Sequence, residues 1–128
     1  MNRKNPLHAM GTNMVIVSAA LVGGGNNANM TVPANTVQRK ETNAAVSGTR
    51  TAEGVYNVVL NSDLMPPRVV AIVPLVEGAG HKAEVTTAYV LATKTVVITT
   101  RNAATTADDL PTTDTLKLLI YGQDSSSG

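Results

Sequence analysis

The feature that most constrains this chain is a pair of strictly alternating runs inside Lys94–Gly122, KTVVITTRNAATTADDLPTTDTLKLLIYG. In each run a β-branched or aliphatic residue occupies every second position, which is the pattern of a half-buried strand. The predicted inward residues are Val96, Ile98 and Thr100 in the first run and Leu116, Leu118 and Ile120 in the second. Thr99 falls on the opposite face of its run. The joining residues 102–115 are small and polar and contain Pro111, so they predict a turn or a long connection.

Further strands are predicted upstream, each bounded by turn residues. A turn at Glu53–Gly54 is followed by VYNVVL, whose alternation places Tyr56, Val58 and Leu60 on one face. The nearly continuous apolar run Arg68–Val76 is typical of a strand that is buried on both sides. Three more segments have strand character: Met14–Val22, Met30–Val37 and Glu84–Leu91. For the first, a short helix is the alternative. In the second, Pro33 predicts an edge or bulged strand. Residues 42–51 predict a connection or a short strand.

The composition explains why these strands need each other. The chain has no Phe and no Trp, and only three Tyr, although aromatic side chains usually supply much of a core's buried area. Burial must therefore come from many small aliphatic side chains, which favours a thin sandwich and makes self-association advantageous. We predict an all-β protein, a small antiparallel β-sandwich with jelly-roll-like topology, formed by residues 14–122. An extended N-terminal arm, 1–13, precedes it and a flexible tail, 123–128, follows it.

The N-terminal arm has no periodic pattern but carries apolar anchors. Two interpretations stay open: a loose terminus, which is common in folded domains, or a segment that docks on a neighbouring subunit or another protein. In the second case the predicted interaction residues are Pro6, Leu7, Met10 and Met14.

Several classes of function are disfavoured. The net charge of +1 comes from scattered basic residues, so no basic patch for nucleic acid is expected. There is no cysteine, which excludes disulfides and thiol catalysis. The apolar run Met14–Val22 is too short to span a bilayer as a helix, and with the polar residues before it predicts no secretory signal. The Gly23–Asn29 loop lacks the Gly-Lys-Ser/Thr of a phosphate cradle, so we interpret it as a turn.

Possible chemical sites are few. His81 with Glu77 and Glu84 has no established metal-ligand spacing, so a solvated hairpin tip is the preferred interpretation. Asp108, Asp109 and Asp114 lack the order of a calcium loop and predict a solvated connection. Glu84 with Asp109 is the only carboxylate pair considered for glycoside hydrolysis, and nothing in the sequence sets their separation. We therefore predict no catalytic residue, no metal site, no cofactor and no enzyme activity.

The order of segments from Thr49 onward resembles that of bacteriophage virion proteins. It runs through GVYNVVL, a proline break, VVAIVPLV, a hairpin, and then TVVITT and a closing LLIYG strand. This order is similar to that of phage fibre heads and of small capsid decoration (cement) proteins. The resemblance covers residues 49–122 and implies a compact β-sandwich, often trimeric. No long repetitive shaft precedes it, which favours a decoration protein over a fibre head.

The expected function is thus a non-enzymatic virion structural protein on the outer capsid surface, a homotrimer that binds the major capsid protein and stabilises the shell, with neither nucleic acid nor membrane as a partner. The alternative is a tail-fibre or receptor-binding head that recognises host surface glycans. A small secreted carbohydrate-active enzyme is a third class, disfavoured because no catalytic set is visible.

Overall fold

The computed structural model describes residues 14–33, 43–78 and 80–123. In these ranges the period-two segments form seven strands, and every strand pairing is antiparallel. The strands are β1 (Met14–Val22), β2 (Ala45–Ala52), β3 (Val55–Leu60), β4 (Arg68–Glu77), β5 (Lys82–Val90), β6 (Thr95–Arg101) and β7 (Thr115–Gln123).

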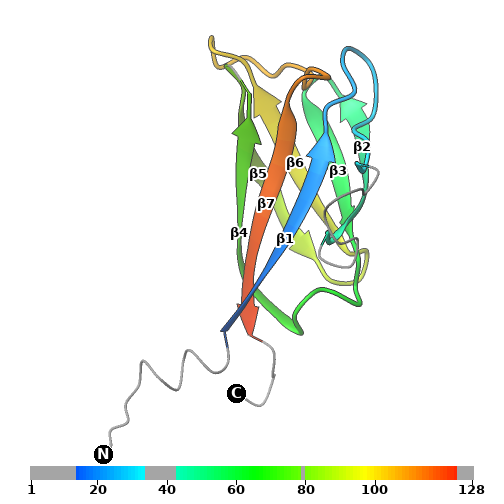
Figure 1. The fold of residues 1–128 in the computed structure, drawn as a ribbon, viewed down its shortest axis with the longest axis vertical. Coiled ribbons are helices and arrows are strands. Elements are labelled where there is room, and N and C mark those ends of the chain that lie inside the picture. The colour runs from blue at the N-terminus through cyan, green and yellow to red at the C-terminus, as the bar shows by residue number, and fades with distance from the viewer. Residues whose placement is uncertain (1–13, 34–42, 79, 124–128) are drawn as a thin grey trace, which may run out of the picture.

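Two sheets pack face to face. One has the order β1-β7-β4 and the other has the order β2-β3-β6-β5. Figure 1 shows β1, β7 and β4 side by side with the four-stranded sheet behind them. The predicted all-β sandwich is confirmed. Its seven strands are one fewer than the eight of a jelly roll.

The core lies between the sheets and is built by the predicted alternation. Ile98 of β6 and Leu118 of β7 are 0% and 1% exposed, and Tyr56 of β3 is fully buried. The inward faces of β3, β6 and β7 are thus the ones that period-two patterning assigned. Because β7 is the middle strand of its sheet and β3 and β6 are the middle strands of theirs, their inward side chains are covered from both sides.

Met14–Val22 is a strand with the predicted bounds, and the alternative of a short helix is wrong. Two other predicted segments differ in extent from the structure. Ala45–Ala52 forms the full strand β2, and the predicted turn at Glu53–Gly54 joins it to β3. The strand expected over Met30–Val37 is wrong for its first half, since only Met30 and Thr31 make single bridges, to Gly48 and Val22. Residues 34–37 lie outside the described residues.

Two burial predictions are wrong. The Arg68–Val76 run was expected to be buried on both sides, but β4 is the edge of the three-stranded sheet. Its outward side chains Val70 and Leu75 are 59% and 50% exposed. Conversely, Thr99, which alternation assigns to the outward face, is only 5% exposed, and its hydroxyl lies 3.0 Å from that of Thr86 on the neighbouring strand β5.

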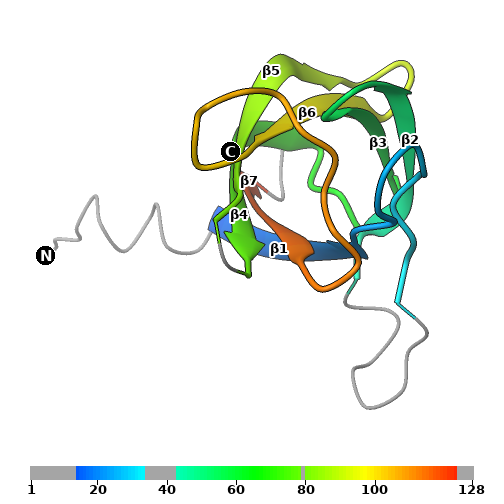
Figure 2. The same ribbon diagram turned by 90° about the horizontal axis from the view of Figure 1, so that it is seen from above.

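The two sheets meet along two sides of the sandwich, β1–β2 and β4–β5, which can be followed in the view along the strands in Figure 2. On the β1–β2 side, the amide of Ala44 donates to the carbonyl of Ser18, and the Asn43 side chain bonds both the N–H and the C=O of Ala20. On the β4–β5 side no strand pairing joins the two edges in the described ranges, although the strands lie near each other. One side is therefore sealed by hydrogen bonds, and the other is a slot.

Candidate functional site

The outward surface of the three-stranded sheet carries several exposed large apolar side chains. We call it the outer face. Strand register places three cross-strand rows on it, which are Ile16–Tyr121–Ala71, Ser18–Leu119–Val73 and Ala20–Lys117–Leu75. Val70 joins them at a bulge in β4. Five of the nine row positions hold an apolar or aromatic side chain larger than alanine, which is unusual for the solvated side of an antiparallel sheet.

The outer face is exposed as well as apolar. Ile16 is 62% exposed and Val73 is 40% exposed. The middle of this face is uncharged: Lys117 Nζ lies 3.0 Å from Glu77 Oε2 at one end, and Arg68 is opposite Gln123 at the other end. Met14, one of the four predicted interaction residues, begins β1 at the other end of this face and is 37% exposed. Pro6, Leu7 and Met10 lie outside the described residues.

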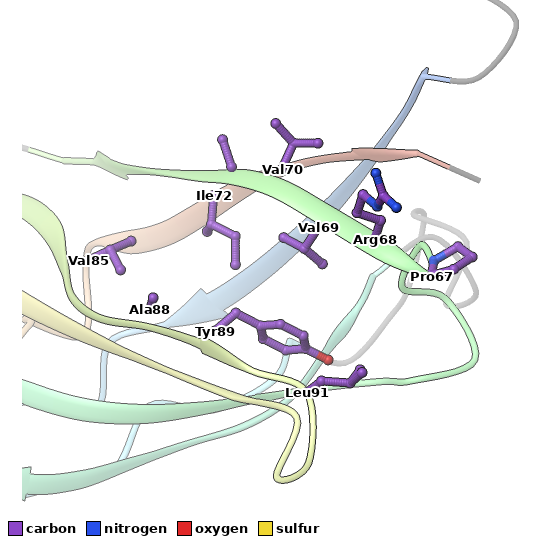
Figure 3. A pocket seen from close by; sticks show the side chains of 10 residues that line it. Pro67, Arg68, Val69, Val70, Ile72, Val85, Ala88, Tyr89 and Leu91 are labelled. Carbon is purple, nitrogen blue, oxygen red and sulfur yellow. The ribbon is translucent and has the colours of Figure 1, made fainter. Parts of the chain in front are cut away.

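The second feature is the slot between the edges of β4 and β5. It has a volume of about 390 Å³, at the lower end of the range for ligand pockets. Figure 3 shows side chains from both strands that point into the space between them, whereas Val70 points away from it. The slot is lined by Val69 and Ile72 of β4, Val85, Ala88 and Tyr89 of β5, and Leu91.

Tyr89 supplies the polar group of the slot. Its hydroxyl is buried and has no hydrogen-bond partner. Burial raises the pKa of this hydroxyl, so it stays a protonated donor over the ordinary pH range. A buried donor without an acceptor costs about 1–3 kcal/mol, and Tyr hydroxyls usually find a partner when they are buried. An acceptor that enters the slot would remove this cost.

The long connection between β6 and β7 carries the buried acidic groups. Asp109 is 6% exposed and its carboxylate accepts three hydrogen bonds of 2.8 Å, from Arg50 Nε and from the backbone amides of Asn27 and Gly54. The next residue, Leu110, is fully buried, and its amide donates to the hydroxyl of Tyr56. This connection is therefore a cap over one end of the core, and Asp109 fastens it to the β2–β3 hairpin.

His81 lies under the same connection. Its Nε2 is 3.0 Å from Asp108 Oδ2 and its Nδ1 is 3.7 Å from Asp114 Oδ2. The His81 side chain is 11% exposed and the Asp114 side chain is 5% exposed. A Cβ atom at Gly78 would collide with the Asp114 carboxylate, so the turn after β4 packs directly on it. The three side chains join the β4–β5 turn to the cap.

These positions correct the sequence interpretation. His81 is not part of a solvated hairpin tip, and Asp109 and Asp114 are not in a solvated connection. The carboxylates beside His81 are those of Asp108 and Asp114, whereas Glu77 pairs with Lys117 and Glu84 pairs with Arg101. Glu84 and Asp109 likewise have different partners, since Glu84 pairs with Arg101 and Asp109 pairs with Arg50.

Among the described residues, no group of three or more His, Asp or Glu side chains has an arrangement that could hold a metal ion. Within the same ranges, no helix has the length and apolar character that a membrane crossing needs. The described side chains form two contact surfaces, the outer face and the slot.

Sequence reasoning missed both surfaces. The signal for the outer face was present in the alternate positions Leu119 and Tyr121, which are as apolar as the inward ones. The signal for the slot was absent, since Val69 and Tyr89 come from strands of different sheets.

Comparison of the chain with models of known protein families, with curated proteins and with solved structures gave no match.

Proposed function

We propose that this protein is a non-enzymatic phage virion protein, a capsid decoration (cement) protein that binds the outer shell as a homotrimer and stabilises it. The observation that carries the proposal is the outer face, which presents apolar side chains from all three strands of one sheet. Soluble monomers rarely leave a contiguous apolar surface of more than a few hundred Å² open to water, and larger ones mark sites of protein contact.

The character of the outer face favours a protein partner over a glycan. Sugars are bound by polar side chains and exposed aromatic platforms, and the only aromatic residue in the rows is Tyr121. Aliphatic side chains such as Ile16 and Val73 instead complement a flat apolar area on another protein. This is what attachment to a shell requires, and it favours the decoration role over the fibre-head alternative.

The rest of the sandwich has the rigidity that a structural protein of a shell needs. The cap over the core is fastened by the buried carboxylate of Asp109, and the β1–β2 side is sealed by Asn43. A body of this kind resists deformation when only one of its faces is held. The resemblance of residues 49–122 to decoration proteins and fibre heads supplies the phage context.

The test is a comparison of binding by surface variants. Ile16→Lys and Val73→Lys place charges on the outer face, at positions exposed enough for the lysine to reach water in the free protein. We expect melting temperatures within a few degrees of the parent chain and binding to shells of the encoding phage weakened at least tenfold. Thr49→Lys, at an exposed position of β2 in the other sheet, is the matched control and should bind as the parent does.

The virion itself provides a second readout. Quantitative mass spectrometry should find a copy number close to that of the major capsid protein, and light scattering should find a mass of about 40 kDa, three copies of 13.3 kDa. A few copies per particle would replace the decoration role with the fibre-head role. Full binding by both outer-face lysine variants would remove the outer face from the attachment site.

A further inference from the structure

The slot leaves one side of the hydrophobic core partly open. Val69 and Ile72 of β4 and Val85 and Tyr89 of β5 pack against buried core residues, and the same four side chains line the slot, as Figure 3 shows. A molecule in the slot would remove their remaining apolar surface from water, which is favourable in proportion to the area covered. The slot is therefore a ready-made apolar binding surface.

The hydroxyl of Tyr89 decides which polar group a ligand must bring. It is buried and has no hydrogen-bond partner among the described residues. The hydroxyl of Tyr56, by contrast, accepts the amide of Leu110. A buried hydroxyl without an acceptor lowers the stability of the free chain, and an oxygen acceptor that enters the slot would satisfy it. A ligand of the slot thus needs one acceptor next to an apolar body.

The charges around the slot require that acceptor to be neutral. Among the described residues that line the slot, Arg68 alone is charged. Arg68 is opposite Gln123, two positions from Tyr121 of the outer face, so alternation directs the Arg68 side chain to the outer face and not into the slot. An ionised group buried between the two strands would be unpaired, which costs far more than burial of a neutral polar group.

The width of the slot limits the shape of the ligand. Cα atoms of β4 and β5 approach within 8 Å of each other, whereas a strand paired with both edges needs two strand spacings, about 9.5 Å. An additional strand therefore does not fit between them, but a single hydrocarbon chain is slimmer. The lining comes from the first half of β4 and the second half of β5, so the slot opens where Pro67 and Leu91 are exposed, away from the turn that joins the strands.

We propose that the slot binds a neutral aliphatic carbonyl compound, a linear ketone or acyl ester. Its chain lies among Val69, Ile72 and Val85, and its carbonyl oxygen accepts the hydrogen bond from the Tyr89 hydroxyl. The site is separate from the outer face, so this inference goes beyond the capsid role and does not rest on it.

Methyl NMR spectra of the full-length chain, titrated with octan-2-one, test the site. The signals of Ile72 and Val85 should shift and saturate, whereas those of Val73 on the outer face should stay in place. Octanoate, which has a carboxylate on a chain of the same length, should bind at least tenfold more weakly. No saturable shift, an equal shift at Val73, or octanoate binding as tight as that of the ketone would overturn the proposal.

Three variants separate the hydrogen bond from the apolar packing. Tyr89→Phe keeps the ring, so it should bind octan-2-one roughly three- to tenfold more weakly and melt no lower than the parent chain. Ala88→Phe fills the slot from an exposed position and should abolish binding, whereas Thr49→Phe, exposed on β2, should bind as the parent does. Parent-like binding by Tyr89→Phe or Ala88→Phe, or a lower melting temperature of Tyr89→Phe, would overturn the assignment. No measurement involves shells, so a failure here is distinct from a failure of shell binding.

Discussion

Replacement of Asp109 by alanine is the perturbation whose cost follows most directly from the structure. The Asp109 carboxylate is the common acceptor for Arg50 Nε and for the amides of Asn27 and Gly54, each at 2.8 Å. It thereby links three segments that are up to 82 residues apart in the chain. The side chain is 4% exposed, so water cannot replace the carboxylate without opening the cap.

The cost of Asp109→Ala comes mainly from the two amides. A buried donor left without an acceptor costs about 1–3 kcal/mol, and the hydrogen bond to Gly54 is buried. Arg50, whose side chain is 22% exposed, turns to water and adds little. We expect a loss of about 3 kcal/mol in the free energy of unfolding. At roughly 4–8 °C per kcal/mol for a domain of about 100 residues, the melting temperature falls by at least about 12 °C.

Thermal and urea unfolding followed by circular dichroism measure this. Asp109→Asn keeps one acceptor oxygen and should lose roughly half as much. Asp63→Ala, at an exposed position in the turn after β3, is the control and should change stability by less than about 0.5 kcal/mol. If Asp109→Ala melts within 3 °C of the parent chain, the cap is not held by this carboxylate and the reasoning is refuted.

The same group predicts a pH dependence. Burial by itself would raise the pKa of Asp109, but the hydrogen bonds from Arg50 and from the two amides outweigh it and lower the pKa. The unfolded pKa is about 3.9, so the folded pKa lies below it. The stabilisation is therefore fully present above about pH 4 and is lost as the pH falls through the lowered pKa. Between pH 4 and pH 2, the parent chain should lose stability more steeply than Asp109→Asn.

Two further predictions concern the core and the histidine cluster. Ile98→Asp and Leu118→Asp each bury an unpaired carboxylate and should lower the free energy of unfolding by several kcal/mol. Thr49→Asp, at an exposed position, should change the melting temperature by no more than about 2 °C, and equal melting temperatures for all three variants would show that the faces are wrongly assigned. A chelator should leave the melting temperature unchanged, because His81 is already paired with Asp108; a shift of several degrees would identify His81, Asp108 and Asp114 as a cation site.

The sequence by itself determined the strands and most of their inward faces. Alternation placed Tyr56, Ile98 and Leu118 in the core, and Gly54 marked the hairpin turn, where its φ of 73° favours a glycine. These features are local, since the side-chain period of a strand and the backbone conformation of a turn depend on residues adjacent in the chain. They could therefore be predicted without knowledge of which strands become neighbours.

Only the tertiary structure decided which apolar residues face the core and which face outward. The apolar run of β4 has the composition of a strand buried on both sides, yet within the described residues no third layer covers the outward face of its sheet, which leaves Val73 open. Asp109 lies in a segment whose sequence predicts a solvated connection, yet its carboxylate is buried, where it accepts hydrogen bonds from residues 27, 50 and 54. The slot exists because β4 and β5 belong to different sheets. Each of these facts depends on contacts between residues far apart in the chain, which periodicity does not encode.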